Sequence, residues 1–158
     1  MPKKNPKRRA VTVFFALLTL AWTALLFYFS GQTGLTSGAL SGRITRALFG
    51  WMIDLGWVQY RPLHVFVRKA AHFALFAIEG GLIALTLGSA LPKRVLIPMM
   101  AGVCALLAVG NELHEYFTAG RSCELRDMLI DFAGAMTGLA LVLLIAWAAR
   151  RAKRKNDI

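Results

Sequence analysis

Four long apolar stretches dominate the pattern of hydrophobic and polar positions along the chain. They cover residues 10–30, 66–88, 94–117 and 128–149. A helix of about 20 mostly apolar residues is long enough to cross the hydrocarbon core of a bilayer. Each stretch is therefore predicted to form one transmembrane helix, and the chain is predicted to be an all-α, polytopic membrane protein with four spans.

The connection between the first and second spans, residues 31–65, is too long for a simple turn. Its apolar residues recur every three or four positions, as on one face of a helix. They are Leu40, Ile44, Leu48, Trp51 and Leu55. The pattern predicts an amphipathic helix that lies in the membrane interface, with Ser37 as a candidate N-cap. Such a helix either covers a polar site or only connects two spans.

The composition agrees with the membrane class, since 57% of the residues are hydrophobic and the mean hydropathy is +0.55. Ordinary soluble domains are more polar. We expect a basic tail at residues 1–9, one four-helix transmembrane domain at residues 10–149 and a second basic tail at residues 150–158. The first apolar stretch is longer than the hydrophobic region of a signal peptide and ends without a small-residue cleavage site, which favours a retained helix.

The net charge of +11 is concentrated at the ends of the spans. Basic residues lie before the first span, between the second and third spans, and after the fourth span. In a chain with four spans, these three segments all lie on the same side of the membrane. Positive residues beside spans stay in the cytoplasm, so both termini and the turn at residues 89–93 are predicted to be cytoplasmic. Basic tails of this kind contact anionic membrane lipids, and we expect no nucleic-acid partner.

The opposite, extracytoplasmic ends of the helices are predicted to carry a set of ionisable residues. They are Arg68, Lys69, His72, Glu112, His114, Glu115, Arg121, Asp127 and Asp131. Residues three or four positions apart share a helix face, as Asp127 and Asp131 do. A charge inside a bilayer costs about 2.5 kcal/mol or more, so we expect these polar faces to point inward and meet.

The acidic residues and histidines of this set are candidates for catalysis or metal binding. They are His72, Glu112, His114, Glu115, Asp127 and Asp131. Carboxylates with an imidazole suit a divalent cation, and a histidine suits acid–base catalysis. The segment ELHEYF is not the zinc-protease signature, because position 118 is threonine rather than histidine. In a purely structural alternative, the basic residues neutralise the acids and hold the bundle together.

The basic residues of the set, Arg68, Lys69 and Arg121, form a candidate anion-binding group. Arg121 follows Gly120, which permits a sharp turn, and a guanidinium presents a planar pair of donors to phosphate or carboxylate. An anionic lipid headgroup or a lipid-linked glycan is therefore a candidate ligand. In the alternative interpretation, an interfacial arginine only reaches out to lipid phosphate.

Glu79 is predicted to lie near the middle of the membrane, about 16 Å along the helix from Arg68 at 1.5 Å per residue. A carboxyl group at this depth must be neutral, paired or reached by water. Thr19, Thr23 and Thr137 are candidate partners. A hydrogen-bonded structural role and a proton relay both remain open.

Three segments of the chain resemble the VanZ-like proteins. They are FSGQTG after the first span, RKAAHFALFAIEGGLIAL on the second, and NELHEYFTAGRSCELRDMLIDFAGAMTG across the last two. The positions that match the family pattern are Arg68, Lys69, His72, Phe73, Glu112, His114, Phe117, Gly120, Arg121, Asp127 and Gly134. Asn111, Glu115 and the pair Thr118–Ala119 depart from it. The resemblance extends over residues 27–140.

This resemblance implies a location in the bacterial cytoplasmic membrane and a link to the glycopeptide antibiotic teicoplanin. We expect a VanZ-like protein whose extracytoplasmic polar site recognises an anionic lipid headgroup, a lipid-linked glycan or a glycopeptide-type ligand. The alternatives are a metal- or histidine-assisted hydrolase or transferase acting on an envelope precursor, and a structural membrane scaffold. The resemblance defines neither a cofactor nor an oligomeric state.

Overall fold

The computed structural model describes residues 6–88 and 93–156. Within these ranges the chain forms five helices and no strand. They are α1 (Pro6–Ser30), α2 (Gly34–Asp54), α3 (Tyr60–Leu87), α4 (Lys93–Tyr116) and α5 (Leu125–Asn156). Four of them, all except α2, are long and apolar enough to cross a membrane. The all-α, multi-pass membrane fold is therefore confirmed. Residues 89–92 of the predicted turn and the outermost parts of both tails lie outside the described residues.

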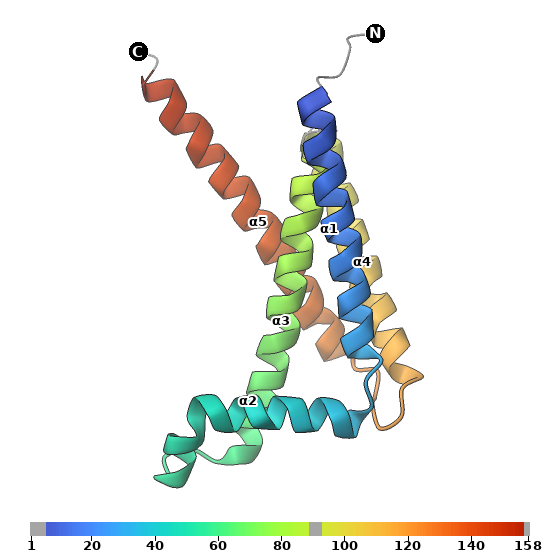
Figure 1. Cartoon of the computed structure of the whole chain (residues 1–158), viewed down its shortest axis with the longest axis vertical. Coiled ribbons are helices and arrows are strands. Elements are labelled where there is room, and N and C mark those ends of the chain that lie inside the picture. Colours follow the sequence, from blue (N-terminus) through green and yellow to red (C-terminus); the bar gives the residue numbers. More distant parts are fainter. Residues whose placement is uncertain (1–5, 89–92, 157–158) are drawn as a thin grey trace.

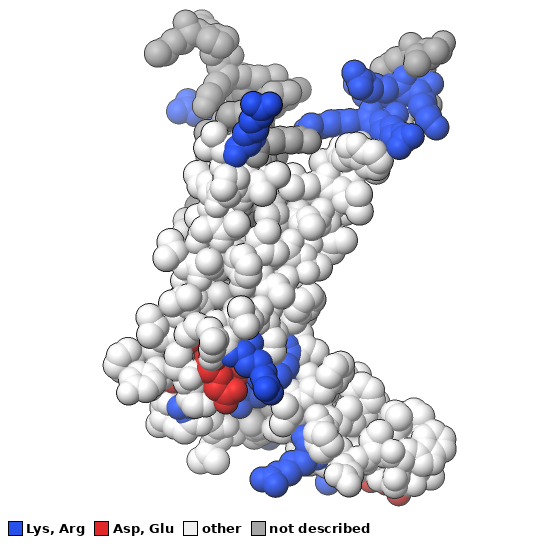
Figure 2. All heavy atoms as spheres, turned by 180° about the vertical axis from the view of Figure 1, so that it is seen from behind, with Lys and Arg blue, Asp and Glu red and all other residues white. Residues whose placement is uncertain are grey.

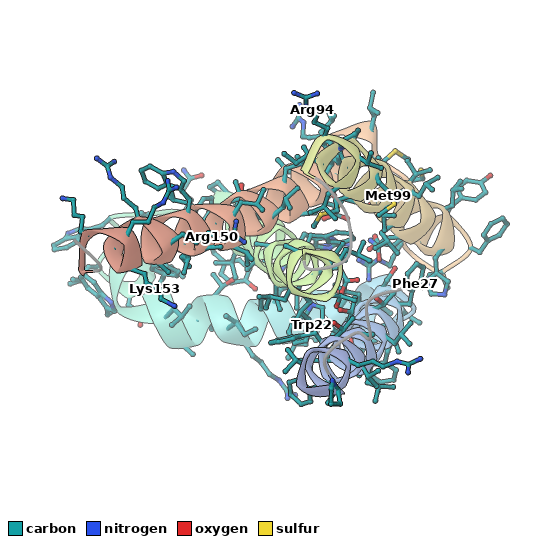
Figure 3. All side chains as sticks on the ribbon, turned by 90° about the horizontal axis from the view of Figure 1, so that it is seen from above. Trp22, Phe27, Arg94, Met99, Arg150 and Lys153 are labelled. Atoms are coloured by element: carbon teal, nitrogen blue, oxygen red, sulfur yellow. The ribbon has the colours of Figure 1, made fainter. Side chains whose placement is uncertain are left out.

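The four long helices form a bundle, and α2 lies across one end of it (Figure 1). We call this end the α2 end. The chain begins and finishes at the opposite end, so both termini lie on the same side of the bundle (Figure 1). Beyond the bundle, the last part of α5, which carries Arg150 and Lys153, diverges from the other helices (Figure 3). Helices α3 and α5 also extend past the apolar stretches into polar sequence, because a helix keeps its backbone hydrogen bonds through the interface.

Charged side chains are distributed as a membrane-spanning bundle requires. On the face shown in Figure 2, a broad central band carries no charged side chain. Basic side chains appear on both sides of this band, and acidic side chains appear only towards the α2 end. The uncharged band is the part of the surface that suits a hydrocarbon environment.

The helix predicted between the first two spans is confirmed as α2, but its N-cap is Thr33 rather than Ser37. Thr33 Oγ1 accepts a hydrogen bond from the Thr36 backbone N–H at 3.3 Å. The earlier start has a tertiary cause, because the Gly34 N–H donates to the Ala119 carbonyl at 3.0 Å. This contact holds the beginning of α2 against the loop between α4 and α5.

The face of α2 that packs on α3 is small and polar. Ser41, Gly42 and Thr45 are buried, and the Ser41 hydroxyl lies 2.7 Å from His64 Nε2. The apolar face, from Leu40 to Leu55, is exposed instead. An amphipathic helix that leaves its apolar face free has the arrangement expected at a membrane interface.

The most extensive helix packing in the bundle is between α3 and α5, and glycines make it possible. A Cβ atom added at Gly80, Gly134 or Gly138 would overlap a backbone carbonyl of the facing helix. Small residues let two membrane helices approach closely. This crossing sets the rotation of α3 and α5 and so determines which polar side chains face each other.

Candidate functional site

A buried polar cluster lies at the α2 end, where α3, α4 and α5 meet. The side chains of Glu112 and Asp131 are 0% exposed, Asn111 is 1% exposed and Glu115 is 2% exposed. His72 joins them from α3, with 17% of its side chain exposed. We refer to these five residues as the polar cluster. Three different helices therefore contribute to one site.

Arg121 is paired with Glu115 in a two-point contact. Its Nη2 lies 2.6 Å from Glu115 Oε1, and its Nε donates to Oε2 at 2.8 Å. The two side chains are only 2% and 3% exposed. Arg121 Nη1 also donates to three carbonyls at the end of α1, those of Phe29, Ser30 and Gln32. Arg121 thus joins the α4–α5 loop, α4 and the end of α1.

The left-handed backbone of Gly120 places this arginine. Gly120 has φ +74°, a conformation that glycine adopts without strain. It also packs against Gly34, where an added Cβ would overlap the Gly120 carbonyl. The loop therefore approaches the start of α2 closely and turns the Arg121 side chain back into the bundle.

Of the three basic residues predicted to bind an anion, Arg68 alone has no carboxylate partner within the described residues. Lys69 is paired with Asp127, and its Nζ also lies 4.0 Å from Glu124 Oε2. Arg121 is paired with Glu115. Arg68 is half-buried on α3, one helical turn before His72. The charges of Lys69 and Arg121 are therefore already balanced inside the protein, and that of Arg68 is not.

His72 lies between two carboxylates. Its Nδ1 is 3.2 Å from Asp131 Oδ1, and its Nε2 is 3.9 Å from Glu115 Oε1. Asn111 joins the same two acids, because its amide Nδ2 donates to Asp131 Oδ2 at 3.3 Å and to Glu115 Oε1 at 3.4 Å. Asn111 was not among the predicted site residues, although its position one turn before Glu115 indicates that it shares this face.

Glu112 completes the cluster and is only partly satisfied. Its Oε2 accepts a hydrogen bond from the Glu124 backbone N–H at 3.0 Å. Its Oε1 is buried and has no hydrogen-bond partner. Ligand atoms of His72, Glu112 and Asp131 all lie within 4.8 Å of one another, a grouping that could hold a metal ion.

His114, the other predicted histidine, lies outside the cluster. Its side chain is exposed, and its Nδ1 is 3.3 Å from the Ser30 hydroxyl. Its ring also meets the edge of the Phe27 ring, with the centroids 5.6 Å apart. The structure therefore separates the two histidines, with His72 among the acids and His114 against α1.

Glu79 lies deeper in the bundle than the polar cluster, on the same helix as His72. Its side chain is 0% exposed, and Thr23 donates a hydrogen bond to its Oε1 at 2.7 Å. Its Oε2 has no hydrogen-bond partner. Of the three threonines predicted as partners, Thr19 contacts a different threonine and Thr137 is exposed on α5. Of these three threonines, Thr23 alone bonds to the carboxyl group, through one of its two oxygens.

The fold and the site together define a multi-pass membrane protein with a buried, charged cluster at one end of its bundle. A family model described as VanZ/LLP1 matches residues 15–146. The chain therefore belongs to the VanZ/LLP1 family, as its three sequence segments predict. No curated protein and no solved structure matches it.

Proposed function

We propose that this VanZ/LLP1-family protein resides in the bacterial cytoplasmic membrane and recognises an anionic headgroup at its outer surface. Two observations support this orientation. Both termini lie at one end of the bundle (Figure 1), and basic residues beside membrane spans favour the cytoplasm. The α2 end, with its acidic and histidine side chains, is then extracytoplasmic. Lipid headgroups, lipid-linked glycans and glycopeptides are the anionic ligands accessible there.

The observation that carries the proposal is the uncompensated charge of Arg68. This guanidinium is half-buried and lies one turn from His72, and no carboxylate of the described residues neutralises it. A half-buried guanidinium without a partner is well suited to bind phosphate or carboxylate, because it offers two parallel donors at little extra desolvation cost. Lys69 and Arg121 position the surrounding acids rather than meet the ligand.

A hollow along the beginning of α2 suits the apolar part of such a ligand. It has a volume of about 540 Å³, within the range of small-molecule sites. Its lining residues are Gln32, Leu35, Thr36, Ala39, Leu40 and Arg43. The guanidinium at this hollow is that of Arg43, and Leu35, Ala39 and Leu40 supply its apolar side chains, an arrangement that suits an amphiphile with an acidic headgroup. Contact with lipid-linked envelope precursors at this hollow would connect the protein to teicoplanin resistance.

Native mass spectrometry of protein extracted together with its lipids tests this function. Charge-assisted hydrogen bonds contribute about 1.5–3 kcal/mol, so Arg68→Gln is expected to retain roughly tenfold less anionic lipid or glycan than the wild type. Arg126→Gln is the matched control, since Arg126 is exposed near the same end of the bundle and also has no ion-pair partner in the part of the chain that the structure describes. Equal retention by the wild type and Arg68→Gln would refute the proposal.

A second candidate function is hydrolysis or group transfer on an envelope precursor. The observation that favours it is the position of His72 between carboxylates, with part of its ring accessible. An imidazole held by an acid can move a proton to or from a reacting group. Incubation of the purified protein with lipid-linked precursors should then release a product that His72→Gln does not release. If His72→Gln releases the product at the wild-type rate, this function is wrong.

A further inference from the structure

The polar cluster contains more carboxylates than cations once each ion pair is assigned. Arg121 neutralises Glu115, and Lys69 neutralises Asp127. Asp131 is left with His72 as its partner, which is charged only when protonated, and Glu112 has no cationic partner among the described residues. Both carboxyl groups are 0% exposed. Burying an uncompensated charge is costly, by several kcal/mol per ion in folded proteins. Glu112 and Asp131 must therefore be neutralised, either by protons or by a cation bound beside them.

An orphan oxygen indicates where this charge belongs. Glu112 Oε1 is buried and has no hydrogen-bond partner, although Oε2 of the same group is bonded to the Glu124 backbone. A buried acceptor without a partner loses its hydration without any compensation. A group that the protein does not itself supply would satisfy this oxygen.

The geometry around Glu112 is that of a mixed nitrogen and oxygen ligand set. Ligand atoms of His72, Glu112 and Asp131 lie within 4.8 Å of one another. Around a tetrahedral ion with bonds of about 2.1 Å, the ligand atoms are about 3.4 Å from one another. Side-chain rotations that shorten the present distances by up to about 1.4 Å would bring the three groups onto one ion, which would connect α3, α4 and α5.

We propose that His72, Glu112 and Asp131 bind one divalent transition metal ion of the Zn²⁺ or Mn²⁺ type. Two carboxylates balance its charge, and the imidazole favours these ions over Mg²⁺ and Ca²⁺, which prefer oxygen ligands alone. Asn111 holds Asp131 through its amide, and Glu115 lies near the second imidazole nitrogen. Such neighbouring hydrogen bonds orient metal ligands in known sites.

A small cavity lies beside His72 on the side of Asn111 and Glu115, and neither Glu112 nor Asp131 lines it. Its volume is about 40 Å³, and His72, Asn111 and Glu115 are among its lining residues. A buried water molecule needs about 15 Å³ on the same measure, so the cavity has room for about two. The metal site stands independently of headgroup binding by Arg68, and its test requires no lipid ligand.

Calorimetric titration of the chelator-treated, full-length protein tests the site. One equivalent of Zn²⁺ or Mn²⁺ is expected to bind, with Mg²⁺ and Ca²⁺ binding at least tenfold more weakly. Glu112→Gln should lower the affinity at least tenfold. Glu124→Gln is the matched control, since it removes an exposed acid nearby and keeps the backbone N–H that bonds Glu112. Unchanged affinity in Glu112→Gln, or similar binding of all four ions, would overturn the proposal.

Pulsed electron paramagnetic resonance of the Mn²⁺-loaded wild type decides the question even if Glu112→Gln does not fold. A directly bound imidazole is expected to produce a nitrogen coupling to the manganese. The absence of this coupling, or the absence of stoichiometric metal binding by the wild type, would show that protons rather than a metal compensate the buried carboxylates.

Discussion

Replacement of Arg121, the ion-pair partner of Glu115, by glutamine is expected to be the most damaging single change at the polar cluster. The guanidinium makes two contacts to Glu115, at 2.6 and 2.8 Å, and both side chains are nearly inaccessible. The shorter, neutral glutamine would leave Glu115 buried without its partner. Removing one member of a buried ion pair destabilises a protein by about 3–5 kcal/mol. We expect about 3 kcal/mol, because the unfolded state of a membrane protein also finds polar partners.

A double variant distinguishes the cost of leaving the Glu115 charge buried without a partner from the cost of losing the Arg121 contacts. In Arg121→Gln combined with Glu115→Gln, no buried charge remains at this position, so about half of the stability lost in Arg121→Gln should return. The free energy of unfolding is measured by titrating the protein in mixed micelles with sodium dodecyl sulfate and following its helical circular dichroism. A loss below 1 kcal/mol in Arg121→Gln would refute the reasoning. Strict additivity of the two single variants would refute it as well.

Two further predictions concern the packing and the buried polar groups of the bundle. Gly138→Leu should strongly reduce the yield of folded protein, because the leucine side chain would overlap the α3 backbone. Gly102→Leu is the control and should not reduce the yield, because the space around Gly102 is open. Equal yields of the two variants in size-exclusion chromatography would contradict the glycine-mediated crossing. Thr23→Val should destabilise the bundle by about 1–2 kcal/mol, because it removes the hydrogen bond to buried Glu79. Thr137 is exposed, so the control Thr137→Val should lower the free energy of unfolding by less than 0.5 kcal/mol. If thermal unfolding shows equal losses of stability in Thr23→Val and Thr137→Val, the Thr23 contact contributes nothing.

The number and type of helices could be predicted from the sequence because these properties depend on local composition. Length and hydropathy identify the four spans, and helical periodicity identifies α2. The N-cap of α2 could not be predicted in this way. Both Ser37 and Thr33 are good capping residues, and the choice depends on a contact between Gly34 and the distant Ala119. Tertiary contacts of this kind have no signature within the segment that they fix.

The composition of the polar cluster could be predicted only in part, because the rotation of each helix decides which residues face inward. At 3.6 residues per turn, Asn111, Glu112 and Glu115 lie within an arc of about 100°, whereas His114 lies about 100° from Glu115. This spacing indicates that His114 points away from the site. The pairing of Arg121 with Glu115 depends on the α4–α5 loop, whose path the sequence pattern does not determine.

The distinction between paired and unpaired groups separates the structural part of this site from its functional part. A purely structural scaffold is most stable when every buried polar group finds a partner within the chain. Arg121 and Glu115 satisfy this condition and hold the helices together. Glu112 Oε1 and Asn111 Oδ1 in the polar cluster and Glu79 Oε2 deeper in the bundle do not. Half-buried Arg68 has no carboxylate partner among the described residues. Because leaving such groups unsatisfied lowers stability, their presence beside a well-paired network favours a binding site that the network supports.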